Sequence, residues 1–529
     1  MSGKIAHQRA ECIQNALKRL LGEQLPSINK LERCTGLNKG SISKILNGQT
    51  IRPGPETVQK LAQGLGIEPG KLNDILVHSA NCANLKPTPD PNPTPQNHHD
   101  WGEAPDVSIF YGRTQELETL QQWIVNDNCR LVALLGIGGI GKTSLGVKLA
   151  QHIQHHFEYV IWRSLRYPPP VQTFLTHLLQ FLYSPSPHDF PEDFHSRVSL
   201  LFQFLKTHRC LLLLDNTEAI FQSGQLAGRY HQDYQGYGEI LRRIGESYHQ
   251  SSVVIISPEK PEDINCFAGN NLPIRTLTLK GLSLAEAQYI FKAKDLSDSH
   301  QWSKLVERYQ GNPLNLKIAA TTIQDLFQGR VSDFLNRQTF VFGQIQTLLE
   351  KQFQRLSPLE QDALYWLAIE PQFVSLSQLQ HDFWQPITTH HLFEIIDSLG
   401  RRSLIETVIK EEEPLFTLPL VVKEYVANRF INQICTEIRG LIITRNLEKI
   451  HFIINYAITP SNSSEVNPPK LQYFSLIETI KTQLISPAMP APKIAEKLDE
   501  LVWHLAEKFP LDIGYALDNL RYLAATFLD

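Results

Sequence analysis

The stretch that decides the fold of the chain's centre is Gly136-Ile-Gly-Gly-Ile-Gly-Lys-Thr143. It follows the apolar run 131–135, precedes a helix-like segment, and has the spacing G-x-x-x-x-G-K-T of a phosphate-binding loop. Glycine lets the backbone curl so that successive N–H groups point at phosphate oxygens. Lys142 can then neutralise the β- and γ-phosphates, and the Thr143 hydroxyl can ligate Mg²⁺. The alternative is a glycine-rich turn with a chance lysine, but the strand–loop–helix context favours phosphate binding.

The composition bounds the class of protein. A chain of 529 residues is long enough for about three to five domains, and its net charge of −4 restricts any contact with nucleic acid to a local surface. The seven cysteines are scattered without a C-x-x-C pair, which argues against a zinc site or a disulfide framework. The sequence has neither a run of roughly 18 apolar residues nor an apolar signal core at its start. We therefore expect a cytoplasmic protein without a membrane partner.

A second nucleotide signature follows the phosphate-binding loop. Four leucines at 211–214 end in Asp215, and a carboxylate at the end of a buried strand can orient Mg²⁺ beside the loop. Four strand-like segments, at 131–135, 159–165, 210–215 and 252–257, alternate with helical stretches. Buried strands that alternate with helices predict a parallel sheet with helices on both faces. We assign residues 107–280 to this nucleotide-binding domain.

Residues 1–80 have the pattern of a small helical module. Apolar residues at helical spacing predict helices at 13–21, from about 27 to 34, at 39–46 and from 55 onward. The turn Thr35-Gly-Leu-Asn38 separates the second helix from the third, and this layout resembles the phage-repressor-like helix-turn-helix family. In that family the second helix of the motif lies in the major groove. The resemblance implies DNA contacts from Asn38, Lys39, Ser41, Ser43 and Lys44.

The charge of this module favours DNA contact but does not decide it. Residues 1–80 hold eleven lysines and arginines against six acidic residues, so they can form a basic surface for phosphates. The alternative is a protein-docking adaptor of the same fold that does not bind DNA. Residues 81–106 follow as a linker, because proline at alternate positions from 87 to 95 excludes helix and favours an extended chain. His98 and His99 are interpreted as incidental, not as metal ligands.

The central motifs occur in a fixed order, which identifies a family by resemblance. The order is Tyr111-Gly-Arg113 with Glu116, the loop 136–143, Trp162-Arg-Ser-Leu165, 211–215, Ser257, Gly281-Leu282 with Glu286-Ala287, and Gly311-Asn-Pro313-Leu314. It resembles the NB-ARC nucleotide switches of the STAND class of signalling NTPases, which include plant disease-resistance and apoptosome proteins, and it looks most like cyanobacterial members. The resemblance covers roughly residues 105–430 and continues more weakly to the end.

The resemblance implies a ligand and a mechanism. The resting ligand would be ADP, and ATP with Mg²⁺ would favour an open form that assembles into homo-oligomers. Pro313 would close over the base. The residues expected to bind the nucleotide are Gly112, Arg113, Gly136, Gly138, Gly139, Ile140, Gly141, Lys142, Thr143, Ser144, Ser257 and Pro313. Thr143 and Asp215 would hold the metal, and Lys142, Asp215 and Glu218 would act in catalysis.

The sequence departs from the family pattern at three places. Asn216 follows Asp215 where the family often has a second acidic residue, and an amide is a poor general base, so Glu218 would have to substitute. Pro258 stands where the family has an arginine that senses the γ-phosphate, although Lys260 could compensate. The winged-helix stretch 416–425 lacks the histidine that would contact the ADP β-phosphate. These changes predict slow hydrolysis. Besides a switch with a DNA-binding module and a switch with a protein-docking module, a third hypothesis is an enzyme that hydrolyses ATP steadily.

The remaining sequence is helical. We expect a lid subdomain at 281–345, a winged helix at 346–430 and a helical tail at 431–529, so the predicted fold class is multidomain α/β. A strand-like pair at 403–409 and 414–418 supports the winged helix, which in this architecture is normally a regulatory arm and not a DNA reader. No internal repeat follows. We therefore expect the trigger to be sensed by the tail, by a separate chain or by a sensor missing from this sequence.

Overall fold

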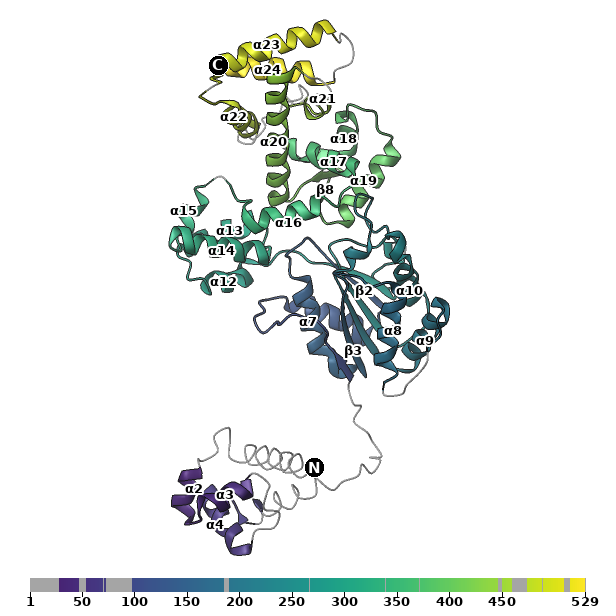
Figure 1. Cartoon of the computed structure of the whole chain (residues 1–529), viewed down its shortest axis with the longest axis vertical. Coiled ribbons are helices and arrows are strands. Elements are labelled where there is room, and N and C mark those ends of the chain that lie inside the picture. The colour runs from purple at the N-terminus through teal and green to yellow at the C-terminus, as the bar shows by residue number, and fades with distance from the viewer. Residues whose placement is uncertain are drawn as a thin grey trace. The chain divides into compact units, whose positions relative to one another are not determined.

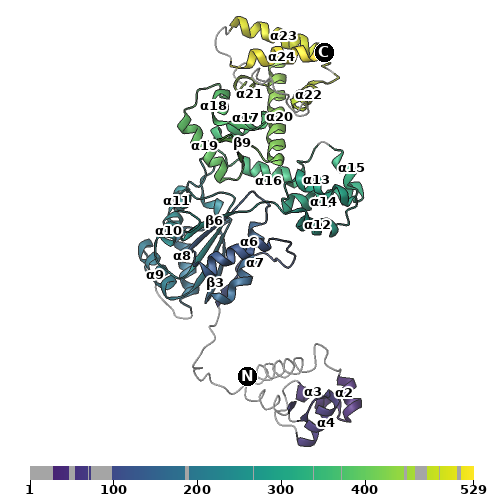
Figure 2. The same ribbon diagram turned by 180° about the vertical axis from the view of Figure 1, so that it is seen from behind.

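The structure is a computed structural model of the chain. It describes residues 28–46, 54–69, 71–72, 98–184, 190–265, 267–337, 339–370, 372–445, 450–458, 473–487, 489–508 and 514–528. The chain divides into two compact units, Met1–Gln96 and Asn97–Asp529, and each is described by itself (Figures 1 and 2). The helix expected at 13–21 and the prolines of the linker lie outside the described residues.

The first unit contains the expected helix-turn-helix. Its described helices are α2 (Ile28–Thr35), α3 (Lys39–Leu46) and α4 (Pro55–Leu65). Leu31, Ile42 and Leu61 are fully buried at the centre of a small apolar core that all three helices share. Gly36 has a φ of 69° in the turn between α2 and α3, a conformation that glycine adopts without steric cost. The helix positions predicted from the periodicity in this region are confirmed.

The second unit is built around a parallel sheet. Its strands are β1 (His98–Asp100), β2 (Leu131–Leu135), β3 (Tyr159–Ser164), β4 (Cys210–Asp215), β5 (Ser252–Ile256) and β6 (Ile274–Thr278). Their order is β1-β3-β4-β5-β2-β6, and every neighbouring pair is parallel. Four of these strands were predicted. The other two are the edge strands, which lack a continuous apolar run because an edge is less buried.

The position of β1 also corrects the expected linker. Residues 98–100 were assigned to the proline-rich linker 81–106, but they pair with β3 and belong to the sheet. The His98 ring stacks on Tyr159 with the ring centroids 4.8 Å apart, and Asp100 forms an ion pair with Arg163 at 2.6 Å. These contacts fix a polar segment to the sheet edge without an apolar pattern, so the sequence reasoning missed it.

Helices cover both faces of the sheet (Figure 1). One face packs against α6 (Thr114–Gln121), the π-helical segment η1 (Gln122–Asn126) and α7 (Lys142–Ile153), followed by the short turn η2 (Gln154–His156). The other packs against α8 (Val171–Leu182), α9 (Phe194–Thr207) and α10 (Gln235–Glu246), while α11 (Glu262–Asn265) follows β5. Two short 3₁₀ turns, η3 (Thr217–Ile220) and η4 (Gln232–Tyr234), lie between β4 and α10.

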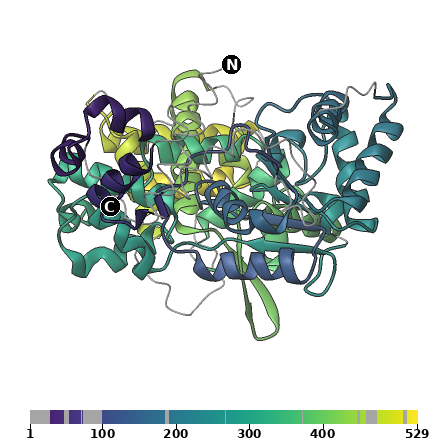
Figure 3. The same ribbon diagram turned by 90° about the horizontal axis from the view of Figure 1, so that it is seen from below.

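Helical segments and a small second sheet follow. The lid contains α12 (Leu284–Lys292), η5 (Ser299–Gln301), α13 (Trp302–Arg308), α14 (Pro313–Phe327) and α15 (Val331–Leu335), and α16 (Gly343–Phe353) leads on from it. The winged helix contains α17 (Pro358–Ile369), β7 (Val374–Ser375), α18 (Leu376–Asp382), α19 (Thr389–Arg401), β8 (Glu406–Lys410) and β9 (Glu413–Thr417). Its strands form an antiparallel sheet in the order β7-β9-β8, and the β8–β9 hairpin projects in Figure 3.

The tail shares a helix and a core with the winged helix. It comprises α20 (Leu420–Thr444), α21 (Phe452–Asn455), α22 (Tyr473–Leu484), α23 (Ala491–Lys508) and α24 (Ala516–Leu528). The boundary expected at 430/431 falls inside α20, and the one expected at 345/346 falls inside α16, because each helix packs on the segments at both of its ends. One apolar core continues from Leu282 to Phe527. Among the helices that the structure describes, no candidate for a bilayer-crossing segment is found.

Candidate functional site

The phosphate-binding loop joins β2 to α7, as its spacing predicts. Gly139 has a φ of 79° and Gly141 a φ of 100°, so the loop needs glycine at both positions to turn into the helix. Gly141 is the residue that precedes the first turn of α7, and Ser144 lies within that turn. The backbone N–H groups at the start of α7 therefore face the concave side of the loop, where a helix N-terminus favours an anion.

Lys142 is buried against its own loop. Its Nζ donates hydrogen bonds to the carbonyl oxygens of Gly136 at 2.7 Å and Ile137 at 3.1 Å. Burial lowers the pKa of Lys142 to about 8, against a smaller opposing effect of Glu218 and Asp215. The amine is thus held beside the loop, and the nearby carboxylates of Glu218 and Asp215 offset its positive charge only weakly. Such a charge suits a group that binds polyphosphate.

Thr143 and Asp215 meet, although their strands are not neighbours. The Thr143 hydroxyl donates to Asp215 Oδ1 at 3.0 Å, across the end of β5, which lies between β2 and β4. Burial raises the pKa of Asp215, and the Thr143 hydrogen bond opposes that shift. A hydroxyl and a carboxylate at this separation fit a hard cation that prefers oxygen ligands. The two metal ligands expected from the sequence are therefore together.

Asn216 has a structural reason to be an amide or a carboxylate. Its φ of 56° lies in the left-handed region, which asparagine and aspartate tolerate better than other side chains. Its Nδ2 donates to Asp215 Oδ2 at 3.0 Å. This contact holds the Asp215 carboxylate in place, and the amide of Asn216 is not itself a base.

Glu218 has an unused acceptor next to this group. Its Oε2 is shut off from solvent and has no hydrogen-bond partner among the described residues. Burial raises the pKa of Glu218, while Lys142 and Arg355 lower it to a smaller extent. Arg355, which follows α16, donates to the backbone carbonyl of Glu218 at 2.8 Å. An orphaned buried carboxylate oxygen fits a site that receives a water or a metal-bound group.

The lid closes directly on the phosphate-binding loop. Asn312 caps α14, because its Oδ1 accepts from the N–H groups of Leu314 at 3.1 Å and Asn315 at 3.3 Å. Its Nδ2 donates in the other direction, to the carbonyl oxygen of Gly138 at 3.0 Å. The Leu314 N–H also donates to the Gly139 carbonyl at 3.2 Å. The first turn of α14, which Pro313 begins, thus rests on the loop.

Arg113 is held in a structural role beside the loop. Its guanidinium donates to Glu116 Oε1 at 2.7 Å and to the Ile140 carbonyl at 3.0 Å, and the side chain is buried. Its backbone N–H donates to Glu286 Oε1 at 2.8 Å. A Cβ added to Gly112 would lie 2.1 Å from the same Glu286 atom, so the lid fits only over glycine. The sequence named Gly112 and Arg113 but assigned no contact to Glu286.

Ser257 is fully buried at the end of β5. Its hydroxyl oxygen accepts from the Glu259 N–H at 3.0 Å, so it supports the following turn.

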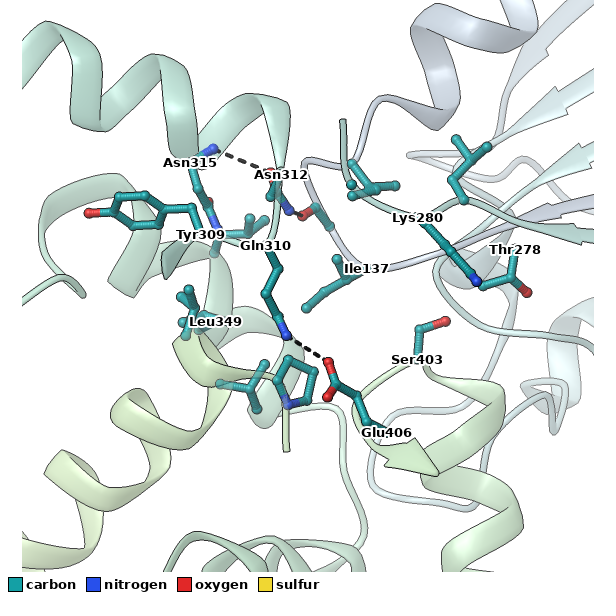
Figure 4. Close-up of a pocket in the computed structure, with 18 of the residues that line it drawn as sticks. Ile137, Thr278, Lys280, Tyr309, Gln310, Asn312, Asn315, Leu349, Ser403 and Glu406 are labelled. Carbon is teal, nitrogen blue, oxygen red and sulfur yellow. Dashed lines mark hydrogen bonds between the residues drawn. The ribbon is translucent and has the colours of Figure 1, made fainter. Parts of the chain in front are cut away.

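A cavity of about 500 Å³ lies where the loop, the lid and the winged helix meet (Figure 4). Ile137, Gly138 and Ile140 contribute the loop side, and Gln310 donates across it to Glu406 Oε1 at 2.6 Å. This volume is typical of a small-molecule pocket. Lys142, Thr143 and Arg113 are not among its lining residues, so the expected site residues divide between the loop interior and this cavity.

The cavity has apolar and polar sides that fit a base or a sugar. The winged helix contributes Pro419, Val421 and Val422, and Pro419 stands in the stretch that lacks the family's histidine. Asn315 lines the opposite side, and its Oδ1 is buried without a partner among the described residues. The residues present therefore fit a nucleotide, with phosphates at the loop and Glu406 as a charged side chain that the winged helix adds to the cavity lining.

The expected DNA-contacting residues all lie on or beside α3. Asn38 caps this helix, since its Oδ1 accepts from the Ser41 N–H at 2.8 Å. The Lys39 side chain is 59% exposed and lies 3.8 Å from Glu32, and Lys44 is also exposed. Ser43 is half-buried on the same helix. Lys39 and Lys44 are the two cations that α3 presents to solvent.

Comparisons with known proteins match both units. The NB-ARC domain profile matches residues 113–224, and the Cro/C1-type helix-turn-helix DNA-binding domain profile matches residues 16–78. An uncharacterised WD repeat-containing protein of Nostoc sp. is 41% identical over 464 residues, which cover 80% of this chain and 37% of that protein.

More distant proteins cover smaller or less similar parts. A probable disease resistance RPP8-like protein of Arabidopsis thaliana is 35% identical over 116 residues, which cover 21% of this chain and 12% of that protein. A solved STAND protein of Pyrococcus horikoshii with a tetratricopeptide repeat sensor covers 78% of this chain and 53% of its own, at 18% identity and a TM-score of 0.33. The chain thus spans less than two fifths of the curated relatives it matches.

Proposed function

Because the chain is an NB-ARC protein of the STAND class with an N-terminal Cro/C1-type helix-turn-helix domain, we propose that it is a signalling switch controlled by ADP and ATP. ADP holds the second unit closed. ATP with Mg²⁺ favours an open form that assembles into homo-oligomers. The helix-turn-helix modules gathered in this way bind DNA together and regulate transcription or a defence response.

One observation carries this proposal: the lid and α16 rest on the phosphate-binding loop itself. Asn312 and Leu314 hydrogen-bond to the carbonyls of Gly138 and Gly139. A Cβ added to Gly138 would lie 2.8 Å from Gln352 on α16. Groups bound in the loop therefore lie next to the contacts that keep the lid closed, and a ligand can shift the closed state only through such differential contacts.

The residues of the site have separable roles in this proposal. The loop N–H groups and Lys142 bind the phosphates, and Thr143 with Asp215 holds Mg²⁺. The bound polyphosphate would supply the negative charge that the loop N–H groups and Lys142 attract. The bound metal would supply the positive charge that Asp215 attracts. Glu218 is the residue that can accept a proton from water, because Asn216 carries an amide, which is a poor general base. Hydrolysis is then a slow reset of the switch.

The described surfaces favour α3, not the winged helix, for DNA. The outer side of α19 presents His390, Glu394 and Asp397, and the β8–β9 turn presents exposed glutamates at 411–413. A helix and a wing with acidic side chains repel phosphates. The α3 surface presents lysines, and several copies would bind with an avidity well above that of one. We place the protein in the cytoplasm, where its four described free cysteines stay reduced.

The nucleotide part of the proposal is tested with Lys142→Ala. Purified wild-type protein should release ADP on denaturation and should sediment as a larger species after ATP is added. Lys142→Ala should lose both properties while it stays folded. Lys148→Ala, on the same helix and half-buried, is the matched control and should retain both. Unchanged nucleotide content in Lys142→Ala would falsify the proposed role of the loop.

The DNA part is tested by binding to a mixed duplex at several salt concentrations. Wild-type protein should bind less tightly as salt increases, because counterions return to the phosphates. The double variant Lys39→Ala/Lys44→Ala should bind at least about tenfold more weakly. Lys60→Ala, which removes an exposed cation from α4, should bind normally. Equal binding by all three, or none by the wild type, would favour the protein-docking adaptor.

A further inference from the structure

A group of charged side chains is buried where the end of β5 meets the winged helix, apart from the phosphate-binding loop. Glu259 follows β5, Arg355 follows α16, and Glu360 and Arg402 belong to the winged-helix region. Glu259 is 2% exposed, Arg402 5% and Glu360 0%. We refer to these four residues as the buried ion cluster. Of these four side chains, Arg355 also contacts the nucleotide site, through the Glu218 carbonyl.

Glu259 is the nucleotide domain's contribution to this cluster. One carboxylate oxygen accepts from Arg402 at 2.8 Å and from Arg355 at 3.2 Å. The other accepts from the backbone N–H of Gly228 at 2.7 Å. A carboxylate with three donors, two of them cationic, is fully compensated for its burial.

Arg402 connects the two sides. Its Nε donates to Glu360 Oε1 at 3.0 Å within the winged helix, and its remaining N–H group donates to the Gln225 carbonyl of the nucleotide domain at 2.6 Å. Ser398 adds a neutral bridge, since its hydroxyl donates to Glu360 at 2.6 Å and accepts from the Ala227 N–H, also at 2.6 Å. The contacts of Arg402 with Glu259 and Gln225, and of Ser398 with Ala227, are lost together if the winged helix moves away, whereas both contacts to Glu360 stay within it.

The geometry makes separation of these parts all-or-none. While the parts are together, each buried charge has a partner. Once they separate, Glu259 loses Arg402, and Arg402 loses both Glu259 and the Gln225 carbonyl at the same time. Removing one partner from a buried pair is far more costly than weakening an exposed one. Contacts between domains of one chain are otherwise mobile by default. A cluster of this kind therefore defines two states with little between them.

The cluster also adjoins the nucleotide site. Arg355 donates both to Glu259 and to the backbone carbonyl of Glu218. The Glu259 N–H donates to the hydroxyl of Ser257 at the end of β5. A shift in the Glu218 segment or in β5 would move a donor or an acceptor of the cluster. The winged helix also reaches the cavity, with Pro419, Val421 and Val422 and with Glu406, which accepts from Gln310 at 2.6 Å.

We propose that the buried ion cluster of Glu259, Arg355, Glu360 and Arg402 is the latch that holds the winged helix on the nucleotide domain, and that opening requires its rupture. Arg355 transmits the state of the Glu218 segment to this latch. The inference rests on the proposed function, because a latch presupposes a closed and an open form. The contact that closes the two parts is then the ion pair between Glu259, after β5, and Arg402, after α19.

The test measures backbone hydrogen exchange of the full-length protein by mass spectrometry. The Ala227 and Gly228 amides report on the latch, because they donate to Ser398 and to Glu259. Arg402→Met removes the shared cation with a similar side-chain length, and Glu360→Gln removes one charge and keeps the shape. Each should raise exchange in the peptide that contains both amides at least about tenfold, with helices α7 and α9 unchanged. Sedimentation should then show larger species with ADP alone.

The control is Arg330→Met, which removes an exposed ion pair with Asp333 in the lid and should change neither readout. If Arg402→Met does not fold, as judged by circular dichroism, Glu360→Gln decides the matter. Unchanged exchange at 227–228 in a folded latch variant overturns the proposal, and so does a uniform rise across the whole chain, which indicates general destabilisation.

The exchange readout needs no nucleotide, so it separates two failures. If wild-type protein holds no nucleotide and does not assemble with ATP, the proposed function fails while local exchange still tests the latch. If wild-type protein switches and the variants exchange normally, the latch alone fails.

Discussion

At the scale of single residues, several side chains have two partners at once. Lys142 binds its own loop carbonyls, and Asn312 caps one helix while it donates to the loop. Asn216 occupies a left-handed backbone position and also fixes Asp215. The sequence predicted Lys142, Thr143 and Asp215 as site residues because their types and spacing are typical of phosphate and metal chemistry, and the structure places Thr143 beside Asp215. It did not find Glu259 or Arg402, because ion pairs between distant segments have no local pattern.

A pH dependence follows for Lys142. Its pKa in the folded protein is about 8, below the ordinary 10.5, because burial disfavours the charge. ADP affinity should be constant below pH 8 and should fall by up to about tenfold per pH unit above it, since the amine must regain its proton to bind phosphate. The unfolded chain keeps that proton up to pH 10.5, so stability without nucleotide should rise over the same interval.

Fluorescent-ADP titrations and urea unfolding from pH 7 to 10 measure the two trends, which should have opposite signs. Lys142→Ala should bind weakly at every pH. A wild-type affinity that is flat from about pH 7 to 10 would contradict the lowered pKa.

At the scale of elements, helix caps connect the lid to the loop. Ser283 forms a capping box with Glu286 at the start of α12. The same Glu286 also accepts from the Arg113 N–H, so one side chain begins a helix and holds the nucleotide domain. The helix starts were predictable because capping residues act locally. Their second contacts were not, because these depend on where the helices pack.

The prediction at this scale concerns Asn312→Ala. It removes the cap of α14 and the contact to Gly138, so we expect a loss of about 1 kcal/mol in stability together with at least about tenfold weaker ADP binding. Thr388→Ala is a matched control, because Thr388 caps α19, a helix of the winged helix, through the His391 N–H. It should lose similar stability with normal ADP affinity. Equal ADP affinity in both variants would show that the Asn312 contact does not matter for binding.

At the scale of the whole second unit, the lid, winged helix and tail share one apolar core. Asn519 is a buried polar residue that hydrogen-bonds to the backbone within this core. Its side chain accepts from the Ile458 N–H at 2.9 Å and donates to the carbonyls of Ile453 at 2.9 Å and Tyr456 at 2.7 Å. Tyr456 in turn contacts Trp366 of the winged helix, with the ring centroids 5.4 Å apart. The tail is therefore part of the structure that supports the winged helix.

Asn519→Ala should destabilise this shared core by about 2–3 kcal/mol, because it leaves buried backbone groups without partners. The loss should appear as one lowered unfolding transition, with faster hydrogen exchange in α17 of the winged helix as well as in α24. Asn455→Ala, whose side chain contacts only His451 at the surface, should stay within about 0.5 kcal/mol of wild type. Faster exchange confined to α24 would indicate that the tail unfolds independently.

The sequence by itself determined the helix-turn-helix, the buried strands and the phosphate-binding loop, because each depends on residue type at fixed local spacing. Only the tertiary structure decided the edge strands, the contact of the lid with the loop, the continuity of α20 through the expected boundary, and the buried ion cluster. Those features join residues far apart in the chain, and their stability comes from packing and paired charges that exist only after the segments meet.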